Sequence, residues 1–171
     1  RIEHLQYTIR NLERLGVSAI AIEDKIGLKS NSLFKVQNKK NHDSVKNFCL
    51  KIKTACNARR SEDFLIVARI ESFILGKNLN DALYRAESYS KAGADLILIH
   101  SKQDTPKEIF LFSKEFKKSR FFKPLVAVPS TYSKVKEKEL IENGFKVVIY
   151  ANHLLRAAYP AMEKVALSIL K

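Results

Sequence analysis

Glycine, proline and cysteine are scarce in this sequence: its 171 residues include 5 Gly, 4 Pro and 2 Cys, and Trp is absent. So little Gly and Pro excludes a sizeable low-complexity or disordered tail. No stretch approaches the roughly 18 uncharged apolar residues of a membrane span, and the N-terminus lacks the apolar core of a signal peptide. Because 46% of the residues are hydrophobic, the chain can still build a core. We therefore expect a globular, soluble, cytoplasmic protein with no membrane partner.

The two cysteines have no metal-binding spacing. Cys49 and Cys56 lie seven residues apart at a segment predicted to be helical, 44–55, so they share one helix face. Intracellular thiols stay reduced. We predict that both are small core residues.

Positive charge is abundant, with 31 Lys and Arg against 18 Asp and Glu and a formal net charge of +13. The basic clusters at 39–40, 114–120 and 134–138 fall on helical or loop segments with acidic residues mixed in. No basic run alternates with aromatic residues to form a platform for stacking bases. We predict a solvated lysine-rich surface and no nucleic-acid partner, and keep a basic nucleic-acid-binding domain as the alternative from another functional class.

One pattern occurs three times along the chain: an amphipathic helix, a glycine, and a short apolar run. The glycines are Gly16, Gly93 and Gly144, and the runs that follow cover 17–22, 94–99 and 145–150. Glycine tolerates the left-handed conformation that ends a helix. Nearly continuous apolar runs are typical of parallel strands, and two more occur at 64–70 and 125–128. The pattern predicts an α/β domain with a parallel sheet.

Two α/β architectures fit five such units, a doubly wound sheet and a (β/α)8 barrel. The chain begins at Arg1 inside an amphipathic pattern formed by Ile2, Leu5, Ile9, Leu12 and Leu15. This start favours a TIM-type barrel fragment that covers about the last five βα units, with residues 1–171 as one catalytic-domain fragment. Helix start signals are predicted at Asn78 with Asp81, and as a capping box at 105–108.

Polar residues follow each predicted strand. They are Glu23-Asp24-Lys25, Arg69 with Glu71, His100-Ser101-Lys102, Pro129-Ser130-Thr131 and Ala151-Asn152-His153. In a parallel barrel these positions meet at the rim that carries active sites. A carboxylate, a guanidinium and an imidazole there suit an anionic substrate held with a divalent cation.

Each of these residues also has a purely structural interpretation. Glu23 or Asp24 could cap the next helix, Arg69 could simply pair with Glu71, and His100 could be a core histidine. His4 and His42 are predicted to lie on the surface, and for Asn152 and His153 both interpretations stay open. The segment 26–43 is rich in Lys, Asn and Ser and much longer than the usual connection of about 2–6 residues, so it is predicted to be an active-site lid or else a surface insertion.

The residues Glu23-Asp24-Lys25, five positions, then Asn31-Ser32 resemble the EDK-x5-NS signature of the phosphoenolpyruvate mutase family, in the isocitrate lyase/phosphoenolpyruvate mutase superfamily. The similarity continues over essentially the whole chain, through the blocks 59–64, 66–72, 92–95, 100–102, 128–132 and 150–153. The sequence departs from the family's pattern at Gly27-Leu28, where an aromatic-proline pair is common, and in the Lys/Asn-rich stretch 35–41. The lid is therefore its least typical part.

The resemblance implies a Mg2+-dependent isomerase that interconverts phosphoenolpyruvate and phosphonopyruvate, forming the carbon–phosphorus bond of phosphonate biosynthesis. It implies that Glu23 helps to hold the metal through water and that Lys29 and Asn31 reach the substrate from the lid. Arg69 would hold the phosphoryl group, and His100 would contact the substrate beside it. The implied catalytic residues are thus Lys29, Asn31, Arg69 and His100, and the last three also bind substrate.

The resemblance further implies a homotetramer whose subunits exchange their last helix. The first three strands of the family's barrel, with the direct metal-binding aspartate, are absent from this sequence, so the fragment alone is expected to be inactive. Phosphonopyruvate hydrolase is the alternative on the same barrel, and Asn31 favours the mutase. A carbon–carbon lyase is the third possibility, although the Lys-[KR]-Cys-Gly-His segment of those enzymes does not occur here.

Overall fold

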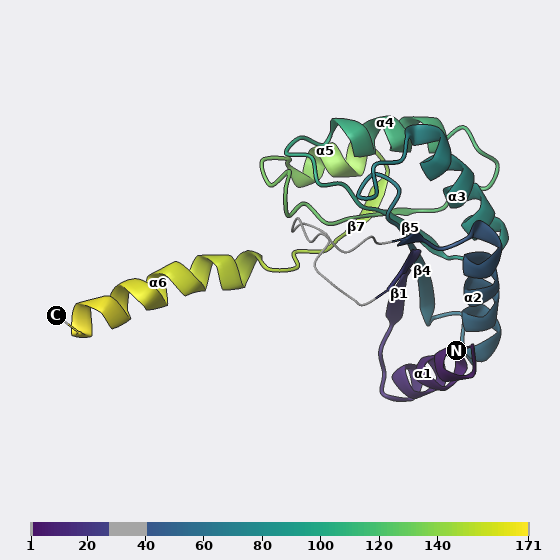
Figure 1. Ribbon diagram of the computed structural model, residues 1–171, viewed down its shortest axis with the longest axis horizontal. Coiled ribbons are helices and arrows are strands. Elements are labelled where there is room, and N and C mark those ends of the chain that lie inside the picture. The colour runs from purple at the N-terminus through teal and green to yellow at the C-terminus, as the bar shows by residue number, and fades with distance from the viewer. Residues whose placement is uncertain (1, 28–40, 171) are drawn as a thin grey trace.

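The computed structural model describes residues 2–27 and 41–170. Helices and strands alternate along most of the chain (Figure 1). In chain order they are α1 (Ile2–Arg14), β1 (Ala19–Glu23), β2 (Lys25–Ile26), β3 (Asn41–His42), α2 (Val45–Ala58), β4 (Leu65–Ile70), α3 (Leu79–Lys91), β5 (Leu96–Ile99), α4 (Lys107–Phe116), β6 (Leu125–Ala127), α5 (Glu137–Glu142), β7 (Phe145–Val148) and α6 (His153–Ile169).

Five strands form one parallel sheet in the order β1-β4-β5-β6-β7. They correspond to the five predicted apolar runs. A doubly wound sheet reverses its strand order at a switch point, whereas here each strand pairs with the next strand of the sheet along the chain. This sequential order is that of a barrel wall. The predicted α/β fold, a part of a TIM-type barrel, is confirmed.

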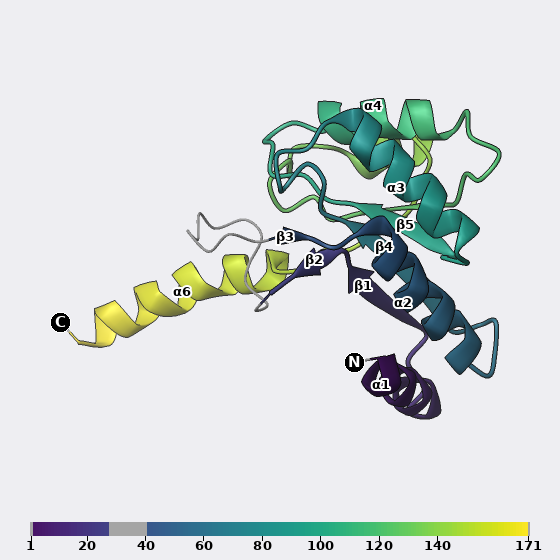
Figure 2. The same ribbon diagram turned by 45° about the vertical axis from the view of Figure 1, so that its right-hand side comes forward.

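The two faces of the sheet differ. Ile66, Ala68 and Ile70 point to the face covered by α2 and α3, where the large core cluster lies. Val67 and Leu96 point to the opposite face, which carries a small apolar cluster and a hollow. The views of Figures 1 and 2 show α2, α3 and α4 on the same side of the sheet. In a barrel this arrangement puts helices outside and the apolar hollow inside.

The predicted glycine stops are confirmed, and Gly93 shows why glycine is needed. Its φ is +111°, a conformation that side chains disfavour, and an added Cβ would lie 3.1 Å from Cys56 Sγ. Cys49 and Cys56 pack against the core as predicted. Burial raises the pKa of both thiols. Both cysteines are therefore structural groups with little thiolate character.

One of the two predicted helix starts is confirmed. Asn78 Oδ1 accepts the Asp81 N–H at 3.0 Å, as a cap should. The predicted capping box at 105–108 is wrong, because Pro106 is the residue before α4 and no side chain caps that helix. Glu108, the expected box partner, instead accepts a 2.6 Å hydrogen bond from Ser101. Its carboxylate thus orders the loop after β5.

The first helix has an apolar face at three of the predicted positions. Ile9 is fully buried, and Leu5 and Leu12 pack against the core. Leu15 is 74% exposed because α1 ends at Arg14 and the chain turns away before it.

The last helix projects from the sheet and buries none of its residues (Figure 1). Its exposed apolar side chains are Leu154, Leu155, Tyr159, Met162, Val165, Leu167 and Ile169. In residues 2–27 and 41–170, no helix is both long and apolar enough to cross a membrane. So large an unpartnered apolar surface is typical of an interface.

Candidate functional site

Three of the predicted site residues meet at the carboxyl ends of neighbouring strands. Glu23 ends β1 and is the register partner of Arg69 on β4. His100 directly follows β5, and the next strand position beyond Arg69 on the same face is Glu71. Arg69 Nε lies 3.8 Å from Glu23 Oε2. The predicted convergence of these strand ends is therefore confirmed for Glu23, Arg69 and His100.

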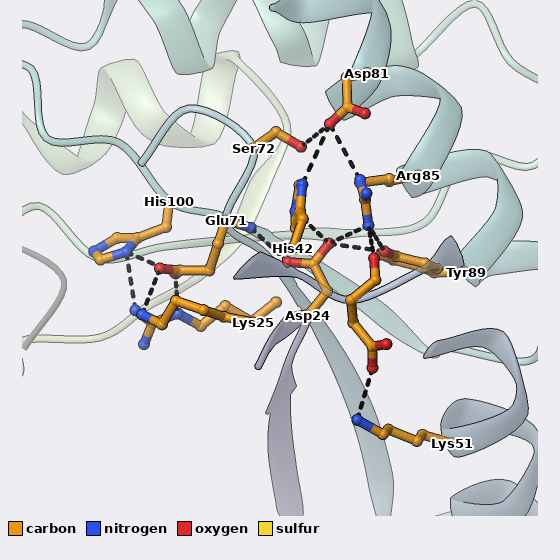
Figure 3. A network of polar contacts seen from close by, with 12 residues as sticks. Asp24, Lys25, His42, Lys51, Glu71, Ser72, Asp81, Arg85, Tyr89 and His100 are labelled. Atoms are coloured by element: carbon orange, nitrogen blue, oxygen red, sulfur yellow. Dashed lines mark hydrogen bonds and ion pairs between the residues drawn. The ribbon is translucent and has the colours of Figure 1, made fainter. Parts of the chain in front are cut away.

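Glu71 is the centre of this group (Figure 3). Its side chain is completely buried, with Oε1 2.6 Å from Arg69 Nε and 3.0 Å from His100 Nδ1. Its other oxygen accepts a hydrogen bond from Lys25 Nζ at 3.1 Å. Burial raises the pKa of Glu71, but its contact with His100 and the charge of Arg69 lower it further, so the net pKa is well below the ordinary value. Glu71 is an anion that three nitrogen groups surround.

The structural interpretations of Arg69 and His100 are also partly correct. Arg69 pairs with Glu71 as that interpretation states, and His100 is 5% exposed. Neither fact removes the two residues from a site, because the Arg69 side chain keeps 26% of its surface exposed at the strand end. A buried carboxylate that fixes a guanidinium leaves the outer edge of that group in a set position.

The sequence interpretation assigns no separate role to Lys25 and treats Glu71 only as a pairing partner. The structure shows that Lys25 has a side chain 2% exposed, 3.1 Å from Glu71 and 3.9 Å from Glu23. The alternation of Arg69 and Glu71 at positions i and i+2 was the available signal, since it puts both on one face of the strand end. The contact of Lys25 with Glu71 joins residues 46 apart and has no local signal.

A second buried polar cluster lies beside the first (Figure 3). Asp24 is completely buried, and its Oδ2 accepts the Tyr89 hydroxyl at 2.7 Å and faces Arg85 Nη1 at 3.3 Å. Its Oδ1 accepts the Glu71 N–H at 2.9 Å, which links the two clusters. Asp24 therefore does not cap a helix, as one interpretation proposed, but holds the ends of β1 and β4 to α3.

The prediction that His42 lies on the surface is wrong, while His4 is exposed as predicted. The His42 side chain is 8% exposed, with Nε2 3.1 Å from Asp24 Oδ2 and Nδ1 3.8 Å from Asp81 Oδ2. Its neighbours in sequence are polar, which is why no local pattern predicts burial. A carboxylate on each side explains how an imidazole can be buried there.

The ends of the long segment 26–43 are ordered by strand pairing, which the sequence does not predict. Lys25 pairs with His42 and Ile26 with Asn41 in an antiparallel two-stranded sheet. The Asp43 N–H donates to the Asp24 carbonyl at 2.8 Å. The two ends of the segment are thus fixed next to Glu23. Lys29 and Asn31, the predicted substrate contacts in this segment, lie outside the described residues.

The other polar strand ends contribute to loops. Thr131 donates to the Ser101 carbonyl, and Arg156 donates to the Ser130 carbonyl, each at 3.3 Å. Asn152 precedes α6 without a side-chain cap, and His153 begins that helix. These contacts order the rim around His100 but bring no further ionisable side chain next to Glu71.

Glu23 is the described residue that best fits a magnesium ligand. Its carboxylate is a hard oxygen donor, partly exposed at the strand end, and Mg2+ takes oxygen ligands and keeps several of its waters. Within residues 2–27 and 41–170, no three His, Cys, Asp or Glu side chains gather as a ligand set. The described residues therefore offer one carboxylate, that of Glu23, that suits a hydrated Mg2+ ion, either as a direct ligand or through a water molecule.

The chain is similar to known enzymes over almost its whole length. The sequence model of the family described as "Phosphoenolpyruvate phosphomutase" matches residues 1–170. A phosphoenolpyruvate phosphomutase of Tetrahymena pyriformis is 39% identical over 156 residues, which cover 91% of this chain and 51% of the relative. The chain thus spans about half the length of that curated relative.

Solved structures agree with the sequence match. The crystal structure of a phosphoenolpyruvate phosphomutase from Streptomyces platensis subsp. rosaceus superposes with a TM-score of 0.91 at 38% identity, covering 99% of this chain and 57% of that one. A phosphonopyruvate hydrolase in complex with oxalate and Mg2+ has a TM-score of 0.86 at 36% identity, covering 98% and 56%. The mutase and the hydrolase are thus about equally similar to this chain. The chain belongs to the phosphoenolpyruvate phosphomutase family, in the isocitrate lyase/phosphoenolpyruvate mutase superfamily of enzymes.

Proposed function

We propose that this chain is the catalytic part of a Mg2+-dependent phosphoenolpyruvate mutase, which interconverts phosphoenolpyruvate and phosphonopyruvate for phosphonate biosynthesis. The observation that carries the proposal is the group formed by Arg69, Glu71 and His100 beside Glu23. It offers a fixed guanidinium and an imidazole to a small anion, next to a carboxylate suited to a metal. Asn31 of the signature favours the mutase over the hydrolase.

In the proposed reaction the bond between phosphorus and the enol oxygen breaks while a bond from phosphorus to carbon 3 of the pyruvate enolate forms. A phosphoryl group in transit is metaphosphate-like and needs positioning and charge stabilisation rather than covalent catalysis. Arg69 would hold its oxygens, and His100 would donate a hydrogen bond beside it. Lys29 and Asn31 would contact the substrate from the segment between β2 and β3. Mg2+ would supply electrostatic stabilisation of the enolate oxygens.

Exclusion of water decides between transfer and hydrolysis. If water reaches the transferring group, the products are pyruvate and inorganic phosphate, as in phosphonopyruvate hydrolysis. The ends of the segment that would cover the site are fixed beside Glu23 by strand pairing and by the Asp43 to Asp24 hydrogen bond. This anchoring at both ends supports our proposal that the segment between them is the lid. Phosphonopyruvate hydrolase is the second candidate, since a related hydrolase is about as similar as the mutases.

Phosphorus NMR separates the candidate activities. The natural full-length protein, supplied with phosphonopyruvate and Mg2+, is expected to produce phosphoenolpyruvate. Inorganic phosphate as the sole product would replace the mutase proposal with the hydrolase. Absence of any turnover, in protein shown to be folded by circular dichroism, would contradict both. A parallel sample with excess chelator controls for the metal and should show no product.

Asn31→Ala tests the residue on which the choice of mutase depends. Loss of one hydrogen bond to a transferring group is expected to lower kcat about a hundredfold. Mg2+ affinity, measured by calorimetric titration, should change far less, because Asn31 is not assigned to the metal. Asn38→Ala, in the same segment but outside the signature, is the matched control and should retain activity. Unchanged turnover in Asn31→Ala would remove the assigned role.

Assembly, extent and location form the remaining part of the proposal. We propose a homotetramer in which α6 packs on a neighbouring subunit, because the helix buries none of its own apolar residues. Residues 1–171 would be part of a single catalytic domain and inactive alone, since the described residues do not gather a full set of metal ligands. The partners would be a small anionic substrate and no nucleic acid. We place the enzyme in the cytoplasm, because such charged acids cross membranes poorly without a carrier.

A further inference from the structure

The Nδ1 atom of His100 faces one hydrogen-bond donor and one hydrogen-bond acceptor. Arg69 Nη2 lies 2.9 Å from it and Glu71 Oε1 lies 3.0 Å from it. Arginine only donates hydrogen bonds, whereas an ionised carboxylate only accepts them. A ring nitrogen carries either a proton or a lone pair, so Nδ1 can satisfy only one of these neighbours at a time. The geometry thus contains two alternative states of the ring.

Glu71 cannot remove this conflict by taking up a proton. Its carboxylate is completely buried and also accepts hydrogen bonds from Arg69 Nε and Lys25 Nζ. Donors on both of its oxygens favour the ionised form of a carboxylate. Among the residues that the structure describes, Glu23 is a further charged neighbour, 3.8 Å from Arg69 Nε and 3.9 Å from Lys25 Nζ. The state of Nδ1 is therefore set by where Arg69 Nη2 directs its hydrogens.

We propose that an anion bound at Arg69 switches the protonation of His100. Without the anion, Arg69 Nη2 donates to Nδ1, and the neutral ring carries its single proton on Nε2. When a bound dianion accepts the hydrogen bonds of Arg69 Nη2, Nδ1 no longer accepts from Arg69. Nδ1 then binds a proton from solvent and donates a hydrogen bond to Glu71 Oε1. The ring is then an imidazolium whose Nε2–H faces the anion, and one proton has been taken up.

This inference rests on the proposed function only in assuming that Arg69 meets an anion. It deepens that function, because a cation formed on binding would stabilise a phosphoryl group better than a neutral ring does. It also gives Glu71 a positioning role: its carboxylate stabilises the protonated form of His100 without touching the substrate. The free protein would keep the ring neutral, which avoids three cationic groups around one buried carboxylate.

Sulfate tests the proposal without any turnover, because it stays a dianion at neutral pH and cannot itself exchange protons. Sulfate is titrated by calorimetry into the natural full-length protein with Mg2+ present, in two buffers of different ionisation enthalpy. We expect uptake of about one proton per sulfate bound. Nitrogen-15 NMR of the imidazole should show Nδ1 unprotonated in the free protein and protonated with sulfate. Binding without proton uptake, no binding, or the same ring state in both samples would overturn the proposal.

Two variants and a control locate the effect. His100→Gln is expected to bind sulfate without taking up a proton. Glu71→Gln removes the charge that stabilises imidazolium, so uptake should fall to about a tenth or less. Glu108→Gln changes another carboxylate, which binds Ser101 at the same rim but not His100, and should keep full uptake. Uptake that persists in folded His100→Gln would assign the proton elsewhere and contradict the switch. Because sulfate does not react, failure of the mutase assay leaves this result interpretable.

Discussion

Replacement of Arg69 by Gln is expected to reduce kcat/KM for phosphonopyruvate about a thousandfold, an effect of about 4 kcal/mol in the transition state. Among the residues that the structure describes, Arg69 is a cation whose side chain is partly exposed and is held in position at the strand end by Glu71. Gln keeps hydrogen-bonding capacity but loses the positive charge and the paired donors of the guanidinium. Steady-state kinetics of both proteins with saturating Mg2+ measure the loss.

Two further variants control for charge and for general damage. Arg69→Lys keeps the charge without the planar fork, and we expect an intermediate loss of about tenfold to a hundredfold. Arg60→Gln removes an exposed arginine from the loop before β4, at the other end of the strand, and should leave kcat/KM unchanged. Activity of Arg69→Gln within tenfold of the natural protein would show that the phosphoryl group is held elsewhere.

The parts of the fold that have local signals were predictable from sequence. Gly16, Gly93 and Gly144 have positive φ in the structure, and a glycine after an amphipathic helix is the local pattern of that conformation. Apolar runs located the five strands, and the three inner strands β4, β5 and β6 are mostly buried, as such runs predict. Once the strands are parallel, their carboxyl ends must share one edge. Glu23, Arg69 and His100 could be grouped for this reason alone.

The parts that depend on contacts between distant residues were not predictable in the same way. Nothing near Asp24 indicates that Tyr89, 65 positions later, donates to it. His42 and Lys25 lie in a polar stretch, yet both side chains are buried because carboxylates from other elements surround them. Polar composition predicts exposure only when no partner compensates the lost hydration. The resemblance to a family supplied the roles of Lys29 and Asn31, which geometry here does not test.

The cluster around Asp24 leads to the largest expected effect on stability. Asp24→Asn is expected to lower the free energy of unfolding by about 3–5 kcal/mol. The substitution keeps the shape of the side chain but leaves the guanidinium of Arg85, whose side chain is 8% exposed, without its buried carboxylate partner. Urea denaturation followed by circular dichroism measures the change. Tyr89→Phe removes one neutral donor from the same carboxylate and one acceptor from Arg85 but leaves the buried ion pair, and should cost about 1–2 kcal/mol.

An exposed ion pair provides the matched control for this prediction. Glu87 and Lys91 pair at 3.9 Å on the surface of α3, and Glu87→Gln should change stability by less than about 0.5 kcal/mol. If Asp24→Asn is no more destabilising than Glu87→Gln, the cluster does not hold the sheet to α3. Asp24 also accepts the Glu71 N–H, so its loss should reach the site. We expect kcat/KM of the folded variant to fall together with stability, whereas Glu87→Gln should alter neither, because the ionised Asp24 holds the Glu71 N–H more strongly than an amide oxygen does.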